Sequence, residues 1–176
     1  MKKILSDILL IVIIPILLFF VNQYIRLINL NIFPNINLIY FTLIALNTNY
    51  KTSYLLSFTL GFFEDYYFSS FFGVNIFSYL VLGILFNFIK NIFKNDTKIN
   101  SILNVFIATL IYGNIKYFLN IYLSKGNLEI LEFIKVILIE ILMNILLVLI
   151  IYLPINKIKN ILMNIYKKNN IYTRYF

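Results

Sequence analysis

The chain has 176 residues, of which 61% are hydrophobic and 12% are charged, and its formal net charge is +8. Runs of Ile, Leu, Phe and Val at this density exclude a soluble globular domain and indicate an integral membrane protein. The sequence has no Cys and no His, which excludes disulfides, thiolate nucleophiles and histidine-based catalysis or metal binding, and we expect no cofactor.

The apolar runs predict an all-α fold of six transmembrane helices, each crossing a hydrocarbon core about 30 Å thick. The first run contains Pro15, where we expect a kink. The second and third runs are short, and the tight link "NYKT" joins them. The predicted spans are residues 4–21, 36–48, 53–64, 74–93, 99–123 and 130–153.

The distribution of basic residues predicts which helix ends face the cytoplasm. With a cytoplasmic N-terminus, eleven Lys and Arg residues lie in inside segments, and only Arg26 and Lys125 lie in outside connections. Cytoplasmic loops of membrane proteins carry such an excess of basic residues. The sequence therefore predicts a multi-pass protein of the inner (cytoplasmic) membrane with both termini in the cytoplasm. Because the basic clusters are short and separated by apolar runs, we expect no nucleic-acid partner.

The residues after the sixth span differ in character, so we divide the chain into a transmembrane domain, 1–153, and a tail, 154–176. Pro154 suits the first position of a new helix. Apolar tail residues recur on one helical face, which predicts a basic amphipathic helix on the inner leaflet, with a solvated tail as the alternative. The lysines expected to contact membrane lipids are Lys157, Lys159, Lys167 and Lys168.

Two adjacent carboxylates, Glu64 and Asp65, lie among aromatic residues in the stretch "GFFEDYYFSSFFGVN". The predicted topology places both at the outer interface, at the end of the third span. For Glu64 we favour a polar turn that ends one helix and caps the next. An intramembrane enzyme that uses the two carboxylates is not expected, because neighbouring residues on a helix point about 100° apart.

The glycines of this stretch have their own expected roles. Gly61 lies one helical turn before Asp65, so the two share a face, and a small residue there allows another helix to approach closely. Gly73 suits a tight turn, and Asn75 suits the start of the fourth span as a helix cap.

The longer segment "LLSFTLGFFEDYYFSSFFGVNIFSYLVLGIL" resembles the signature of the bacterial rod shape-determining protein MreD family. In that family a Gly precedes an Asp by four residues, and a polar turn leads to Gly and a further membrane helix. The resemblance extends upstream to "FPNINLIYFTLIAL" and downstream to Asn144, whereas Phe71 and Phe72 depart from the family's small residue and Pro. The matching residues of the signature are Gly61, Asp65, Gly73 and Asn75.

The resemblance implies a non-catalytic membrane scaffold of the cell-elongation machinery. Such a scaffold links the periplasmic protein MreC and the filament protein MreB to peptidoglycan synthesis by RodA and a class B penicillin-binding transpeptidase. Partner helices would pack closely at Gly61, Gly83 and Gly113. The alternative is the substrate-binding membrane subunit of an energy-coupling-factor vitamin transporter, whose six-helix bundle is similar. The absence of Ala and Gly from the first span counts against that alternative.

Among the ionisable residues inside the predicted spans, Lys116 and Glu140 need partners because an unpaired charge in the membrane is costly. Their depths differ by about 4 Å at a rise of about 1.5 Å per residue, which a lysine side chain can reach across. We predict an interhelical ion pair between them, extended by hydrogen bonds from Asn120 and Asn144. A proton or ion relay is the functional alternative.

Overall fold

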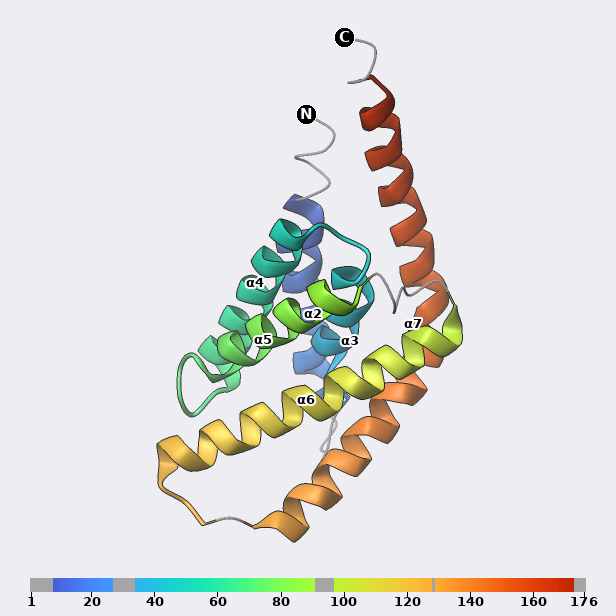
Figure 1. Cartoon of the computed structure of the whole chain (residues 1–176). Coiled ribbons are helices and arrows are strands. Elements are labelled where there is room, and N and C mark those ends of the chain that lie inside the picture. Colours follow the sequence, from blue (N-terminus) through green and yellow to red (C-terminus); the bar gives the residue numbers. More distant parts are fainter. Residues whose placement is uncertain (1–7, 27–33, 91–96, 128, 173–176) are drawn as a thin grey trace.

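The structure is a computed structural model that describes residues 8–26, 34–90, 97–127 and 129–172, without the side chains of residues 23, 25, 26 and 154–172. The described residues form helices joined by short connections, which confirms the all-α class (Figure 1). In chain order they are the π-helical segment η1 (Leu9–Ile13) and the α-helices α2 (Ile14–Arg26), α3 (Ile36–Ala45), α4 (Tyr50–Phe68), α5 (Val74–Ile89), α6 (Lys98–Ser124) and α7 (Ile130–Tyr172).

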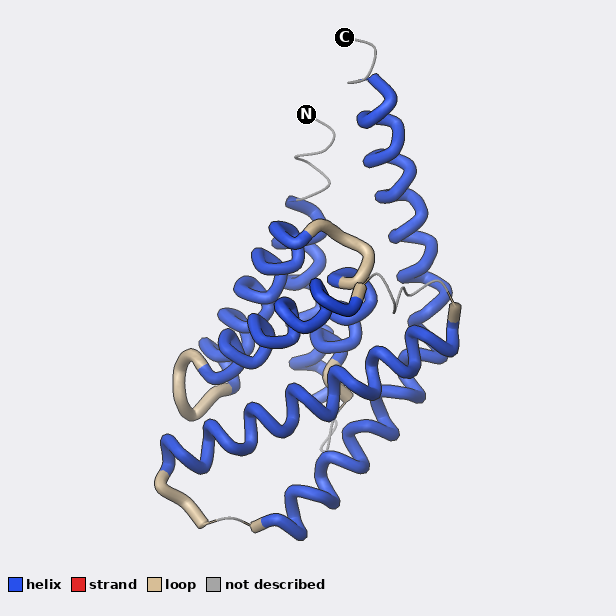
Figure 2. Tube along the Cα trace, in the orientation of Figure 1, coloured by secondary structure: helices blue, strands red, loops and turns tan. Residues whose placement is uncertain are grey.

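The short helix α3 lies at the centre of the bundle. All ten of its residues are buried, because it packs against α2 and α4 on one side and against α6 and α7 on another (Figures 1 and 2). A helix that is apolar on every face belongs in such a central position. At about 1.5 Å per residue, α3 is about 15 Å long, about half the hydrocarbon thickness of a bilayer.

The outer helices form two hairpins around α3. Helix α4 packs along α5, and α6 packs along α7, while α5 and α6 join the two hairpins. The outward faces are strongly apolar: Phe88, Leu131 and Ile150 are each at least 70% exposed. An apolar surface of this extent is suited to lipid or to a partner rather than to water.

The first predicted span changes from π-helical to α-helical winding next to Pro15, where the sequence predicts a kink. The π-helical segment η1 precedes α2, and the N–H of Ile14 reaches back to the carbonyl of Leu9. In that register the carbonyl of Leu10 faces Pro15, which has no N–H to donate. The hydroxyl of Tyr40 on α3 donates to this carbonyl at 2.9 Å, so a tertiary contact satisfies a backbone acceptor that the local helix leaves unpaired.

Helix α7 differs from the prediction, because it continues through Pro154. It runs for 43 residues from Ile130 to Tyr172, so Pro154 does not begin a separate helix. A proline inside a helix removes one backbone hydrogen bond, and membrane helices tolerate this where neighbouring groups satisfy the freed carbonyl. Figure 1 shows the last turns of α7 projecting beyond the other helices. The side chains of the four tail lysines lie outside the described part, and their contact with lipid stays a prediction.

Two of the described helices are long and apolar enough to cross a membrane, namely Lys98–Ser124 and Ile130–Leu153. Three shorter apolar helices accompany them, at Leu9–Asn22, Ile36–Ala45 and Val74–Ile89. The predicted number of six crossings and the cytoplasmic location of both termini stay predictions.

Candidate functional site

The carboxylate of Asp65, near the end of α4, caps the start of α5. Its Oδ2 atom accepts the backbone N–H groups of Gly73 and Ile76 at 3.0 and 2.9 Å, and its Oδ1 atom accepts that of Asn75 at 2.9 Å. The first N–H groups of a helix have no partner within it, and a carboxylate at that end also interacts favourably with the helix dipole. The cap of α5 therefore comes from Asp65 on the preceding helix, whereas Asn75, the cap predicted from the sequence, lies inside the first turn.

Gly61 brings the two helices together one turn before this cap. A Cβ added at Gly61 would lie 2.5 Å from the Cα of Ile76 and 2.8 Å from its backbone nitrogen, so the backbones of α4 and α5 touch there. Gly73 has φ of +104°, a conformation in which glycine is favoured because it has no Cβ. The structure thus brings the four signature residues together in one joint between α4 and α5.

The sequence predicted that Glu64 lies in a polar turn that ends one helix and caps the next. In the structure it lies within α4 and is buried, with only 4% of its surface exposed. Its Oε1 atom accepts hydrogen bonds from Asn37 Nδ2 at 3.0 Å and from Tyr79 Oη at 2.9 Å. Its Oε2 atom accepts one from Tyr112 Oη at 2.7 Å. The prediction was wrong because Glu64 points about 100° away from Asp65 around α4, into the bundle, where α3, α5 and α6 supply the three donors.

Asn75 extends this cluster to the start of α5. Its side-chain amide lies 2.6 Å from Tyr112 Oη, and a phenol has a single proton, which already serves Glu64. When the Oδ1 of Asn75 faces Tyr112, its Nδ2 has no partner. The opposite orientation of the amide lets Nδ2 donate to Tyr112 Oη, while the phenol proton stays with Glu64. We call this set, Asn37, Glu64, Asn75, Tyr79 and Tyr112, the Glu64 network.

A second buried contact joins α7 to α3 and α6. Asn144 is completely buried; its Oδ1 accepts the backbone N–H of Asn35 at 2.8 Å, and its Nδ2 donates to Thr109 Oγ1 at 3.0 Å. The side chain of Asn35 accepts the N–H of Leu38 at 3.0 Å and caps α3. Asn144 therefore fixes the start of the central helix, in place of the predicted link to the Lys116–Glu140 pair.

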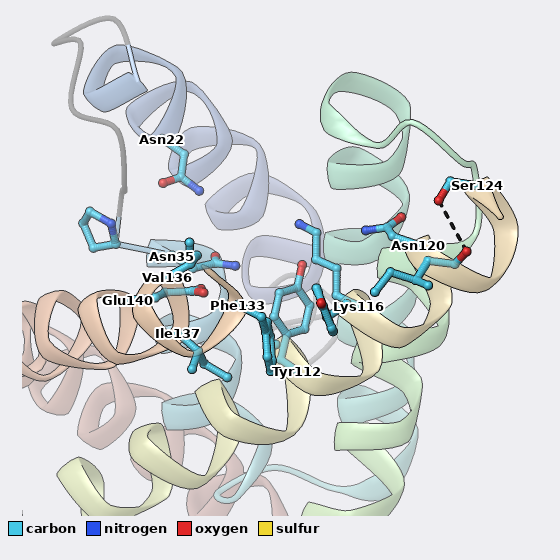
Figure 3. A pocket seen from close by; sticks show the side chains of 14 residues that line it. Asn22, Asn35, Tyr112, Lys116, Asn120, Ser124, Phe133, Val136, Ile137 and Glu140 are labelled. Atoms are coloured by element: carbon cyan, nitrogen blue, oxygen red, sulfur yellow. Dashed lines mark hydrogen bonds between the residues drawn. The ribbon is translucent and has the colours of Figure 1, made fainter. Parts of the chain in front are cut away.

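Lys116 and Glu140 line one cavity of about 590 Å³ between α6, α7 and the ends of α2 and α3. Figure 3 shows them projecting from different helices on separate sides of it. Among the contacts of the described residues, no ion pair within 4.0 Å joins them, and the Lys116 amine lies 5.5 Å from the centroid of the Tyr112 ring. The direct ion pair predicted from the sequence is therefore not formed in this structure, because the two side chains extend from their helices on separate sides of the cavity. Asn120 lines the same cavity.

Sequence reasoning missed five of the residues that hold these contacts. A polar residue within an apolar span needs a hydrogen-bond partner, and this signal was present in the asparagines of "FPNINLIYFTLIAL". The tyrosines gave no such signal, because the chain contains 14 of them. The missed residues are Asn35, Asn37, Tyr79, Thr109 and Tyr112.

The three glycines expected to pack against partner helices are used inside the bundle. Gly61 contacts α5, and a Cβ at Gly83 would lie 2.7 Å from Ser57 Oγ on α4. A Cβ at Gly113 would lie 2.9 Å from the side chain of Ile137 on α7. Small residues here bring helices of the same chain into contact, which is the usual effect of such residues between membrane helices.

Comparison with the curated proteins and with the solved structures found no match to the chain. The family model of the rod shape-determining protein MreD matches residues 1–160, a range that includes the joint at Gly61 and Asp65, the Glu64 network and Asn144. The chain belongs to the MreD family of rod shape-determining membrane proteins.

Proposed function

We propose that this protein is a non-catalytic scaffold of the cell-elongation machinery, which links an MreC-like periplasmic protein and an MreB-like filament to peptidoglycan synthesis. Membership of a rod shape-determining family supports this role and favours it over the vitamin-transporter alternative. RodA and a class B penicillin-binding transpeptidase would be partners, directly or through MreC.

The scaffold role is supported by the observation that both central carboxylates, Glu64 and Asp65, accept hydrogen bonds from groups of the bundle itself. Asp65 accepts three backbone N–H groups, and Glu64 accepts three side-chain donors from three other helices. Both groups are buried, and each is fixed by donors of the bundle. Such a network rigidifies and specifies one arrangement of helices, which suits a protein that presents fixed surfaces to partners.

The outer face of α7 is suited to partner binding within the membrane. Four leucines at helical spacing share this face and are between 49% and 78% exposed, and they are Leu131, Leu138, Leu142 and Leu149. Helices that meet in a bilayer associate by packing of such apolar side chains. Contact with cytoplasmic partners would use the projecting end of α7, which carries the tail lysines.

Cell-shape complementation combined with co-purification tests the scaffold role. A rod-shaped host depleted of its own MreD would receive this chain, and cell width would be measured while an MreC homologue is recovered from detergent extracts. We expect restored rod shape and recovery of MreC. Reduced recovery with Leu131→Ala, Leu138→Ala and Leu142→Ala combined would assign the contact to α7. The matched control is Phe88→Ala on the exposed face of α5.

Two results would contradict the proposal. The first is a chain that accumulates in the membrane, elutes as a single species and still recovers no MreC homologue. The second is rod shape that is restored equally by a chain unable to bind MreC. Either result would remove the bridging role while leaving family membership in place.

The predicted topology has a direct test, because the chain has no Cys. Single cysteines at Lys51 and Lys125 would be exposed to a maleimide that cannot cross the membrane. Six crossings with a cytoplasmic N-terminus require labelling of Lys125→Cys in intact spheroplasts and labelling of Lys51→Cys only after lysis. The reverse pattern would invert the orientation, and labelling of both from outside would contradict the number of crossings.

A further inference from the structure

The cavity between α6, α7 and the ends of α2 and α3 carries two charges of opposite sign that are not in contact. Lys116 comes from α6 and Glu140 from α7, and both line the cavity. Figure 3 shows them on separate sides of it. A charge taken out of water is costly unless a partner of opposite sign approaches it. Each of these groups therefore favours a counter-charge placed in the space between them.

The amine of Lys116 has a defined position beside the cavity. It lies 5.5 Å from the centroid of the Tyr112 ring, an arrangement in which the ring face attracts a cation. Tyr112 is itself fixed by its hydrogen bond to Glu64. The amine therefore lies on the side of the cavity next to the Glu64 network. Its N–H groups can donate to a ligand in the cavity.

Two further polar atoms in the cavity lining are buried and have no partner in the described structure. They are the hydroxyl of Tyr117 and the side-chain oxygen of Asn120. Buried polar atoms of this kind are normally hydrogen-bonded. Both atoms are enclosed by protein, each with less than 1 Å² accessible, so a polar ligand in the cavity would supply the missing bonds only after the side chains of Tyr117 and Asn120 rotate toward it.

Apart from Asn22, Asn35 and Ser124, the rest of the lining is apolar, so the cavity is amphipathic. Tyr117 on α6 stacks on Phe133 of α7 with ring centroids 4.0 Å apart, and this pair joins the two helices at the rim. Apolar side chains next to it come from both helices: Ile121, Val136 and Ile137. A volume of about 590 Å³ lies within the range of small-molecule sites.

From this arrangement we infer that the cavity binds a zwitterionic group, whose anionic end contacts Lys116 and whose ammonium end contacts Glu140. The chemistry is shared by a phosphoethanolamine lipid headgroup and by free phosphoethanolamine. The apolar rim of Phe133 and Val136 would accommodate the start of an acyl chain in the first case. This site is independent of partner binding, and neither the family nor the scaffold role requires it.

Thermal stability of the full-length protein in a neutral maltoside detergent tests the site. The probes are short-chain phosphatidylethanolamine, free phosphoethanolamine, and short-chain phosphatidylglycerol, which has the phosphate but no ammonium. Because a ligand that binds only the folded state raises the melting temperature, we expect a concentration-dependent rise with phosphatidylethanolamine and a much smaller one with phosphatidylglycerol. A rise with free phosphoethanolamine as well would show that the headgroup suffices, and its absence would assign the ligand as a lipid.

Matched variants separate the cavity from general effects of charge. Lys116→Met and Glu140→Gln are each expected to raise the half-saturating concentration of phosphatidylethanolamine at least about tenfold, as the loss of a charge-assisted hydrogen bond does. The controls Lys135→Met and Glu132→Gln change exposed residues of α7 and are expected to change it less than twofold.

Two results would overturn the inference. One is the failure of both zwitterionic probes to raise the melting temperature of the unmodified protein. The other is equal stabilisation by phosphatidylglycerol that Glu140→Gln leaves unchanged, which would make the site an anion site. Neither result bears on recovery of MreC, so failure of the site and failure of the scaffold role are distinguishable.

Discussion

Gly61 of α4 lies directly against Ile76 of α5, where an added Cβ would come within 2.5 Å of the Ile76 Cα atom. The N–H of the same Ile76 donates to Asp65 at 2.9 Å. The glycine and the carboxylate one turn later thus act on the same residue. Because Gly61 has no side chain, the backbone of α5 can lie against α4 at this point. The Asp65 carboxylate then accepts the Ile76 N–H that this contact brings close to it. This is a physical reason for the four-residue spacing of the signature.

Replacing Gly61 by Ala is expected to separate α4 from α5. The new methyl group would meet backbone atoms, which cannot move aside as a side chain does, and overpacking of this kind costs about 1–3 kcal/mol. The control is Gly113→Ala, also within a helix, where the methyl group would meet only the end of Ile137. Both substitutions raise helix propensity by a similar amount. The difference between the melting temperatures of the two variants in detergent therefore reports the steric clash of the new methyl group with the backbone of α5. Equal melting temperatures would contradict the close contact.

Replacing Asp65 by Ala is expected to lower the free energy of unfolding by about 2–4 kcal/mol, because three N–H groups at a helix start lose their acceptor. Asp65→Asn keeps one acceptor oxygen and should lose about half as much. Hydrogen exchange gives a local readout: the amides of Asn75 and Ile76 should exchange faster in both variants. Unchanged exchange at these two amides, with Glu132→Gln as the control, would show that another group caps α5.

Replacing Glu64 by Gln is expected to destabilise the bundle by about 1–3 kcal/mol, since three donors then converge on a side chain with one acceptor oxygen. Tyr79→Phe should cost less in the Glu64→Gln background than in the unmodified protein. Residues of one hydrogen-bond network show coupling of about 0.5–3 kcal/mol in such a cycle. Strict additivity of the two changes would contradict a shared network.

Replacing Tyr40 by Phe is expected to cost about 1–3 kcal/mol, because the buried carbonyl of Leu10 loses its donor. The cause can be tested with Pro15→Ala, which restores a backbone N–H within reach of that carbonyl. Tyr40→Phe should then cost less than half as much as it does in the presence of Pro15. An equal cost in both backgrounds would show that Tyr40 acts through packing and not through the carbonyl.

The sequence predicted the helices of this protein better than the burial of their polar side chains. Helical class and the approximate positions of the helices follow from apolar runs, and Gly61 and Asp65 follow from a spacing that fits one helical turn. The prediction that a new helix begins at Pro154 was wrong, because α7 continues through this proline to Tyr172, as membrane helices can.

The burial of Glu64 could not be predicted from its neighbours. Glu64 and Asp65 are adjacent and equally polar, yet one caps a helix while the other lies in the centre of the bundle. The difference depends on donors that approach from α3, α5 and α6, at positions 27, 15 and 48 residues away. Local periodicity contains no information about such pairings.

Composition and residue spacing by themselves determined that this chain is an apolar helical protein with a pair of carboxylates between two of its helices. Hydrophobic runs and the helical repeat are local patterns, which can be read within a few residues of the sequence. Only the tertiary structure decided which polar groups meet, because hydrogen bonds within the bundle depend on how helices distant in the chain are packed. Asn144 is the clearest case: its position in α7 was evident from the sequence, but its bonds to Asn35 and Thr109 exist only once three helices are assembled.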